Sequence, residues 1–268
     1  MKSVIINRSE IRVLLKEYLL ATPHAPYTSI VGGIVASKVV YDLTNLLSVF
    51  YIKPYSGLSR IQRIEWNNRG MSSMHAVFIT FFSLYSIFLS DLFHDEQTGS
   101  VVTLKSSLFS ILGLGVSVGY FLADMGLIVW HYPSLGGKEY VIHHSLSALS
   151  IMYTMVSGEG QIYCYFCLIS ESTTPAINIR WYLDMSGLKR SPAYLINGVG
   201  ILMMWLVARV MLFVYIFWHI YEHYQQVLRM RGFGRLIVIV VPFVLFVMNL
   251  VWLAKILKGV KKTLAKRL

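Results

Sequence analysis

Long apolar runs separated by short polar segments dominate the pattern of hydrophobic and polar positions along the chain. Runs of roughly the 20 residues that a helix needs to cross a bilayer occur at residues 27–50, 71–90, 106–130, 141–157, 160–181, 194–219 and 235–257. The run at 141–157 is short, and polar residues interrupt the run at 160–181. The pattern predicts an all-α polytopic membrane protein with about seven transmembrane helices, gathered in one domain at 27–257.

The two ends of the chain differ from this domain. Within residues 1–26, apolar side chains follow helical spacing at Ile11, Leu14, Leu15, Tyr18 and Leu19. This spacing indicates an amphipathic helix that lies on the membrane surface or packs against another part of the protein. The first 20 residues lack the continuous apolar core of a cleavable signal peptide. Residues 258–268 form a basic tail.

Composition and charge agree with a membrane protein. The chain is 56% hydrophobic and only 14% charged, against about 45–50% and about 25% in soluble domains. The net charge of +11 comes mainly from basic residues outside the apolar runs. Such residues usually contact anionic lipid on the cytosolic side, so the charge does not imply a nucleic-acid partner.

The distribution of basic residues also predicts an orientation. With seven spans, the segments 51–70, 131–140 and 182–193 share a face with the C-terminal tail. Together with the tail from Lys255 on they hold 13 Lys and Arg, against 8 on the opposite face. The positive-inside rule then places the C-terminus in the cytosol and the N-terminus in the lumen. The sequon at residues 7–9 would face the lumen.

The two cysteines give no sign of a metal or redox site. Cys164 and Cys167 lie one helical turn apart inside a predicted span, with no second cysteine pair. A structural zinc site needs four ligands, so buried free thiols are the better interpretation. We therefore expect no disulfide, no metal and no bound cofactor.

Several ionisable and polar residues lie inside the predicted spans, where they are costly and usually face a bundle interior or a wet cavity. Lys38 and Asp42 are four residues apart in the first span, so they share a helix face and can neutralise each other. Glu171 and Arg209 lie within the fifth and sixth spans. In the predicted topology, six further residues fall in the half of the bilayer nearer the cytosol: His75, Asp124, His143, His144, Asn178 and Arg180. Their shared depth predicts a site.

The adjacent histidines at the start of the fourth span are the strongest candidates for chemistry. Neighbouring residues on a helix point about 100° apart, so His143 and His144 cannot both aim at one atom, and a zinc pair would prefer a spacing of four. One histidine facing the cavity as base, nucleophile or hydrogen-bond donor, with the other supporting it, fits better. Asp124 could fix the imidazole tautomer. Two histidines that bind lipid headgroups at the interface are the alternative.

The fifth span contains a second unusual feature. Five polar residues at 170–174 directly precede Pro175. A proline inside a helix removes a backbone hydrogen bond and kinks the helix, and serine and threonine hydroxyls can satisfy the freed carbonyls. The segment either lines a cavity next to the histidines or simply shapes the bundle.

Three stretches resemble the TLC domain, which ceramide synthases, translocating-chain-associating membrane proteins and ceroid-lipofuscinosis membrane proteins share. They are EWNNRGMSSMHA at 65–76, YFLADMGLIVWHYPSLGGKEYVIHHSLSAL, and SGEGQIYCYFCLISESTTPAINIRWYL. The resemblance covers roughly residues 27–257. It implies a protein of the endoplasmic reticulum with six family helices around a central cavity and a role in lipid synthesis, sensing or trafficking.

The resemblance also implies candidate site residues. Ceramide synthases of this family join a fatty acyl-CoA to a sphingoid base, and their essential histidine pair corresponds to His143 and His144. They carry two acidic residues three apart on the next helix, where this chain has Glu171 and Thr174. The first acid is replaced by its longer homologue and the second is missing, as is the homeobox-like segment of many ceramide synthases. These departures put the synthase reaction in doubt.

Two functions follow as candidates. The first is lipid homeostasis through binding of a membrane lipid or acyl chain in the helical cavity, lined by His75, Thr174, Asn178, Arg180 and Arg209. The second is an N-acyltransferase that uses acyl-CoA as co-substrate and a sphingoid base as acceptor, with His143, His144, Asp124 and Glu171 as catalytic residues. A transporter that uses the intramembrane charges, a membrane adaptor and a homodimer are weaker alternatives.

Overall fold

The computed structural model describes residues 23–93 and 101–265, with side chains up to residue 261. The described segments contain helices and no strands. The helices are α2 (Ala25–Tyr51), α3 (Lys53–Ser56), α4 (Arg60–Leu84), η2 (Tyr85–Leu89), η3 (Val102–Leu104), α5 (Leu108–Trp130), α6 (Lys138–Ser157), α7 (Gln161–Ile169), η4 (Ser170–Thr173), α8 (Thr174–Met185), α9 (Pro192–Trp205), η5 (Leu206–Met211), α10 (Leu212–Glu222), α11 (Tyr224–Val227) and α12 (Gly232–Ala265). The chain is an all-α polytopic membrane protein.

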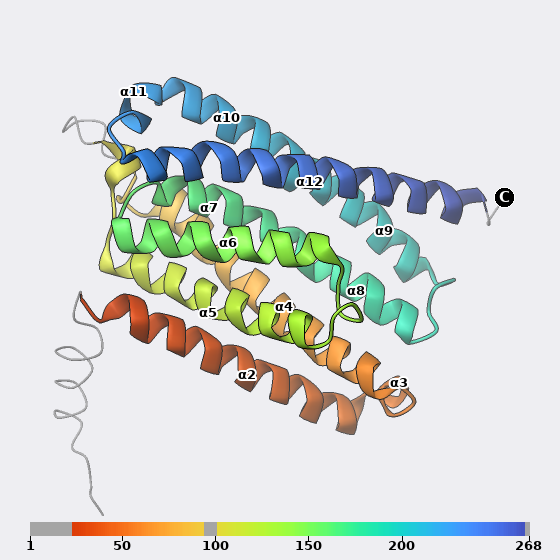
Figure 1. Cartoon of the computed structure of the whole chain (residues 1–268). Helices are drawn as coiled ribbons and strands as arrows, with labels where there is room; N and C mark the ends of the chain where they lie inside the picture. Colours follow the sequence, from red (N-terminus) through yellow and green to blue (C-terminus); the bar gives the residue numbers. More distant parts are fainter. Residues whose placement is uncertain (1–22, 94–100, 266–268) are drawn as a thin grey trace, which may run out of the picture.

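Seven helical segments lie alongside one another within the described residues (Figure 1). Five of them are long and apolar enough to cross a membrane: 25–51, 60–89, 108–130, 192–222 and 232–261. The other two are α6 and the combined segment α7–η4–α8, which correspond to the short and the interrupted apolar runs. Both segments contain polar side chains because each forms part of the wall of the cavity described below.

The loops define two ends of the bundle. We call the end that carries α3, the loops 131–137 and 186–191 and the end of α12 the C-terminal end (Figure 1). The described start of α2 lies at the opposite end, as an odd number of segments requires. The amphipathic helix predicted within residues 1–26 and the sequon at 7–9 lie outside the described residues, as does the last part of the basic tail.

Helix α2 packs against α5 through small residues. Gly33 lies directly over the backbone of Val116, and Gly119 lies over the backbone of Ile30, so closely that a Cβ atom at either glycine would overlap the neighbouring carbonyl. Close backbone approach at small residues is the usual way in which membrane helices associate, because lipid gives apolar side chains little reason to leave it. This contact places α2 at one edge of the bundle (Figure 1).

The second span begins earlier than its apolar run. We expected residues 51–70 to form a loop, and this expectation is wrong: α4 starts at Arg60. Ser59 and Gln62 form a capping box, in which the Ser59 backbone N–H donates to Gln62 Oε1 at 2.9 Å and the Gln62 N–H donates to Ser59 Oγ at 3.4 Å. Such a cap fixes the helix start. The polar residues that follow therefore lie on a helix.

Three of the spanning segments depart from regular α-helical winding. The fifth changes to a 3₁₀ turn at Ser170–Thr173, immediately before Pro175 in the first turn of α8, where the sequence predicts a kink. The sixth contains a π-helical stretch at Leu206–Met211, and the second ends in another at Tyr85–Leu89. Wide turns of this kind are frequent at functional sites, and the one in the sixth span carries Arg209.

A tight turn at the opposite end joins α6 to α7. Gly158 and Gly160 have φ angles of 75° and 73°, a region that side chains rarely allow. Between them the Glu159 carboxylate accepts a hydrogen bond from the Tyr153 hydroxyl at 2.9 Å and from the Arg231 backbone N–H at 3.3 Å. The turn therefore ties α6 to the start of α12.

Candidate functional site

A cavity of about 650 Å³ occupies the half of the bundle nearer the C-terminal end. All six spanning segments from α4 to α12 contribute to its wall, whereas α2 does not. Eight of the nine residues that we singled out from the sequence line it: Asp124, His143, His144, Glu171, Thr174, Asn178, Arg180 and Arg209. Polar side chains from separate spans thus meet at one internal site.

His144 is held by acceptors on both sides of its ring. Its Nε2 lies 2.7 Å from Asp124 Oδ2, and its Nδ1 lies 2.9 Å from the backbone carbonyl of Tyr140. A carbonyl only accepts, so Nδ1 carries a proton, and a second proton lies between Nε2 and the carboxylate. Asp124 also accepts from Asn68 Nδ2 at 2.6 Å and from the Tyr120 hydroxyl at 3.2 Å. The arrangement fixes the ring and joins α4, α5 and α6.

Glu171 anchors a second group in the cavity. Its Oε1 lies 3.5 Å from Nη2 of Arg209 and 3.8 Å from Nε2 of His143. The Thr174 hydroxyl donates to Oε2 at 2.8 Å, so the residue in place of a second acid supports the first one. Arg209 also donates from Nε to the Thr173 hydroxyl at 2.8 Å. Glu171 and Arg209 are both buried, and because their charges are opposite the pair adds little net charge to the cavity.

His143 is less constrained than His144. Its Nδ1 is buried and has no hydrogen-bond partner among the described residues, and its ring meets those of His144 and Trp252 edge to face, at centroid distances of 5.5 and 5.7 Å. The planes of the His143 and His144 rings are inclined by 78° to each other. His143 is therefore the imidazole with a free nitrogen, and His144 is the fixed one.

A third polar group closes the cavity on the side of α4 and α8. Asn178 accepts from Arg69 Nη1 at 2.9 Å and donates to the Ser72 hydroxyl at 2.8 Å and the Ser73 hydroxyl at 2.9 Å. Arg69 pairs with Glu65 one turn earlier at 2.6 Å. Asn178 thus fastens α8 to α4 through side chains that a membrane interior would otherwise leave unsatisfied.

Arg180 forms part of the wall between α8 and α9. Its Nη1 donates to the Tyr194 carbonyl at 3.0 Å, and its guanidinium lies 3.9 Å from the centre of the Tyr194 ring. Gly198 provides the space, because a Cβ atom at that position would collide with Nη1. The cation therefore lies against α9 at the wall of the cavity.

His75 is the one predicted cavity residue that does not line it. It is buried between α4 and α5 and stacks on Tyr120 with the ring centres 3.8 Å apart. Neither ring nitrogen has a hydrogen-bond partner among the described residues. Its position one turn beyond Ser72 on α4 places it behind Tyr120, which itself faces the cavity. His75 supports the wall and does not reach the cavity.

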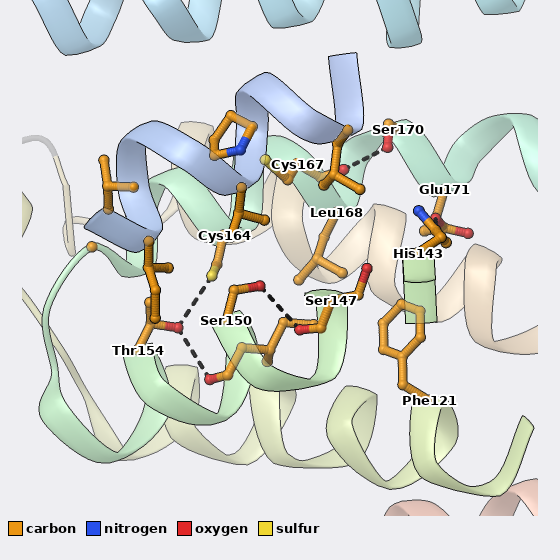
Figure 2. A pocket seen from close by; sticks show the side chains of 17 residues that line it. Phe121, His143, Ser147, Ser150, Thr154, Cys164, Cys167, Leu168, Ser170 and Glu171 are labelled. Carbon is orange, nitrogen blue, oxygen red and sulfur yellow. Dashed lines mark hydrogen bonds and ion pairs between the residues drawn. The ribbon is translucent and has the colours of Figure 1, made fainter. Parts of the chain in front are cut away.

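A second, narrow cavity of about 40 Å³ adjoins the first. Phe121, His143 and Glu171 line both. Figure 2 shows it extending from these residues past Ser147 and Ser150 to Thr154, with Cys164 and Cys167 on the facing helix. Its walls are formed mainly by α6, α7 and α12. The imidazole of His143 therefore lies where the wide polar cavity meets a narrow one.

Metal binding finds no support in the described part of the chain, where no three His, Cys, Asp or Glu side chains are arranged to hold an ion. Both cysteines are free thiols, and Cys164 Sγ lies 3.1 Å from the Thr154 hydroxyl. The intramembrane pair expected from the sequence is present: Lys38 Nζ lies 2.5 Å and 2.7 Å from the two carboxylate oxygens of Asp42. This pair is exposed on α2 and is remote from the cavity wall.

The sequence analysis missed several residues of the site. We assigned Arg69 to a loop, and did not single out Asn68, Tyr120 or Trp252 as site residues, yet all four line the cavity. The signal for two of them lies in EWNNRGMSSMHA, where Asn68 and Arg69 are followed at helical spacing by Ser72. Polar residues at that spacing next to an apolar run indicate an extension of the helix toward a polar interior.

Comparison with known proteins agrees with this architecture. A profile of the TLC domain matches residues 65–258, which begin in α4 and include the six segments around the cavity. The chain is 32% identical over 216 residues to TLC domain-containing protein 4-B of Xenopus laevis, covering 78% of this chain and 79% of that protein. It is 27% identical over 214 residues to TLC domain-containing protein 4 of Homo sapiens, covering 79% and 80%.

The fold and the site are those of a polytopic helical membrane protein with a polar cavity inside the bundle. The chain belongs to the TLC domain family. A search of solved structures found no match.

Proposed function

We propose that this protein binds a membrane lipid in its cavity, with the acyl chain directed into the bundle, and that it acts in lipid homeostasis. The observation that carries the proposal is the cavity of about 650 Å³ inside the membrane-spanning bundle, where polar groups from six segments converge. Its volume falls in the range of about 300–1,000 Å³ typical of small-molecule sites.

The wall supports a ligand with one polar and one apolar part. Ile177, Ile201 and Ile256 supply aliphatic surface, and Trp205 and Trp252 supply aromatic surface. The charged groups are largely paired with one another, as Glu171 is with Arg209. A few placed polar groups in an otherwise apolar pocket fix the orientation of a ligand. An amphipathic lipid satisfies both kinds of surface.

The narrow cavity supports the position of the acyl chain. It continues from His143 into the half of the bundle nearer the opposite end, and beyond His143 and Glu171 its polar side chains carry only hydroxyl and thiol groups. A polar head beside His143 and Glu171 would direct its hydrocarbon chain toward this space between α6 and α12, which would have to widen from about 40 Å³ to admit the chain. Because lipid tails are as apolar as such a wall, the polar groups at His143 and Glu171 would determine where the ligand lies.

A matched pair of substitutions on α8 tests lipid binding. Ile177 lines the cavity, whereas Ile179 is 48% exposed on the outer face of the same helix. Protein purified from membranes and reconstituted in nanodiscs is extracted, and bound lipid is quantified by mass spectrometry. Ile177→Trp should lose the bound lipid class, and Ile179→Trp should keep it. Equal lipid content in both variants and the wild type would refute the proposal.

N-acyl transfer is a second candidate, and the free nitrogen of His143 between two cavities favours it. In this reaction the amine of a sphingoid base attacks the thioester carbon of a fatty acyl-CoA, the C–N bond forms and the C–S bond breaks. His143 would accept the proton that the amine loses and return it to the departing sulfur, and Glu171 would stabilise the imidazolium. His144, held by Asp124, would position the helix. Acyl-CoA is then a co-substrate, and no bound cofactor takes part.

Purified protein incubated with labelled acyl-CoA and sphinganine decides between the two candidates. The transferase requires an amide product in the wild type that His143→Ala and His144→Ala abolish. His223→Ala, at the opposite end of the bundle, serves as the control and should retain activity. A wild type without product, together with lipid lost in Ile177→Trp, would remove the transferase and leave lipid binding.

The cellular setting is also part of the proposal. We place the protein in the endoplasmic reticulum, with the C-terminal end in the cytosol, so that the cavity faces cytosolic substrates. Basic residues such as Lys189 in the loop 186–191 support this orientation. A fluorescent fusion and a protease-protection assay of a tag at Leu268 test both statements, and a protected tag would reverse the orientation.

A further inference from the structure

The outer face of α2 carries an ion pair halfway along the helix. Lys38 is the middle residue of the 27-residue helix, about 20 Å from either end at 1.5 Å per residue. It pairs with Asp42, yet the two side chains remain 70% and 56% exposed among the described residues. Charged groups at mid-membrane depth normally face a protein interior or a wet cavity, and this pair faces neither.

The lysine cannot easily escape to the membrane surface. Half of a hydrocarbon core of about 30 Å is about 15 Å, and the four-carbon stem of a lysine does not cover that distance from the centre of the helix. The side chain is moreover held by the Asp42 carboxylate. The pair therefore needs a polar partner outside the described bundle if it is to leave the lipid.

The pair lies on a regular seam. Exposed residues follow alternating steps of four and three along α2 at Val31, Val35, Lys38, Asp42, Asn45 and Val49. This is the spacing by which two helices form a left-handed pair. At 100° per residue, the seam lies roughly 160° around the helix from the stripe Ser29, Gly33 and Ser37 that packs into the bundle. One face of α2 is therefore used within the chain. The other faces away, except that Asn45 at its edge accepts a hydrogen bond from the Tyr55 hydroxyl at 2.7 Å.

We propose that this seam joins two copies of the chain into a homodimer through α2. Each copy carries both charges, so the seam is complementary to itself under a two-fold axis, in which residue i of one copy contacts j of the other and j contacts i. Two copies in one membrane have the same orientation, and the axis therefore runs along the membrane normal with the two α2 helices parallel. Lys38 and Asp42 then occupy successive layers of the seam, in which each residue lies beside its own copy and one layer from the opposite charge of the other copy. The four charges cancel as a group.

The dimer is independent of the proposed function. The cavity is walled by α4 to α12 and receives nothing from α2, and the TLC domain match begins only in α4. Pairing through α2 therefore leaves one complete cavity in each copy. Loss of the dimer should leave lipid binding intact, and loss of lipid binding in Ile177→Trp should leave the dimer intact.

Cross-linking in native membranes tests the seam directly. Val35→Cys places a thiol on the seam at a site 56% exposed. Leu43→Cys places one at a site 49% exposed, about 120° around the helix from the middle of the seam and about 80° from Val35. The wild type with its native cysteines gives the background. A short thiol-specific cross-linker should convert Val35→Cys to a dimer band and leave Leu43→Cys monomeric.

Charge reversal tests the ion pair without relying on its intrahelical form. Lys38→Asp makes both positions acidic, and Asp42→Lys makes both basic, so each variant loses the pair within its own helix. With Val35→Cys in the background, each variant expressed alone should lose the dimer band. Two differently tagged variants expressed together should regain it as a mixed dimer, because opposite charges then face each other only across the interface.

The outcomes separate the possible occupants of the seam. A Val35→Cys protein that stays monomeric, or that cross-links no better than Leu43→Cys, would overturn the proposal. The Lys38–Asp42 ion pair would then face lipid. A cross-linked product with a different protein would overturn it in favour of a heterologous partner. If the charge variants fail to fold, the two cysteine variants with native charges still decide.

Discussion

Removing the Asp124 carboxylate should destabilise the whole bundle, because it is the acceptor at which three spans meet. It receives hydrogen bonds from Asn68 on α4 at 2.6 Å, from Tyr120 on α5 at 3.2 Å and from His144 on α6 at 2.7 Å. Asp124→Ala leaves these three groups without their acceptor in a site where Asp124 is 4% exposed. Water has little access there to replace it.

The size of the effect follows from the burial of the pair. Removing one partner of a buried ion pair costs about 3–5 kcal/mol. A change of 1 kcal/mol lowers the melting temperature of a chain of 150–250 residues by about 2–4 °C, so the Asp124→Ala protein should melt roughly 6 to 20 °C below the wild type. An Asp124→Ala, His144→Ala double variant should lose less than the sum of the single losses, because the two side chains share one interaction.

The assay and its control are available within the same chain. Melting is followed by the loss of the monodisperse peak of detergent-solubilised protein after heating. Asp184→Ala removes a carboxylate that binds Lys189 at 2.7 Å in an ion pair whose lysine is 64% exposed, and such pairs contribute about 0.2–1 kcal/mol. An Asp124→Ala shift no larger than that of Asp184→Ala would refute the view that this carboxylate holds the bundle together.

Two further predictions concern glycines. Gly33→Leu should separate α2 from α5 and lower the melting temperature strongly, because any Cβ would overlap the Val116 carbonyl. Gly32→Leu on the adjacent face should change the melting temperature little, because no atom lies within 4 Å of an added Cβ. Similar melting temperatures for both variants would contradict the packing of α2 on α5. Gly160→Ala should cost more stability than Gly187→Ala, since both have positive φ but only Gly160 has a neighbouring side chain 2.7 Å from the added methyl. Melting curves of the four variants test both predictions. Equal losses of stability in Gly160→Ala and Gly187→Ala would contradict the second one.

The sequence predicts the class of fold well and its boundaries less well, for one physical reason. Hydropathy reports the lipid-facing surface of a helix, and most of that surface is apolar along the five clear spans. Where a helix faces a polar cavity, its composition resembles that of a loop. The sequence therefore indicates a loop before residue 71 although α4 begins at Arg60, and it indicates a short fourth span because Lys138 and Glu139 open α6 ahead of the apolar run.

The candidate site, too, is predicted only in part by the sequence. Shared depth in the bilayer was sufficient to group Asp124 with the histidines, because depth follows from position along a span. Rotation about the helix axis and the side on which neighbours pack do not follow from it. His75 therefore has the right depth but lies behind Tyr120, while Arg209 near the middle of its span reaches Glu171. The different partners of His143 and His144 also depend on these rotations.

The π-helical stretch at Leu206–Met211 determines how the sixth span responds to the loss of a residue. A wide turn of this kind absorbs one extra residue, so α9 and α10 keep the angular relation of one continuous helix. Deleting one residue inside the stretch would restore uniform winding with little rotation of α10, and the buried Phe213 and Ile216 would keep their neighbours. The same deletion in the regular part of α9 would rotate α10 by about 100°, so the stretch is a place where the sixth span can lose a residue without turning its second half.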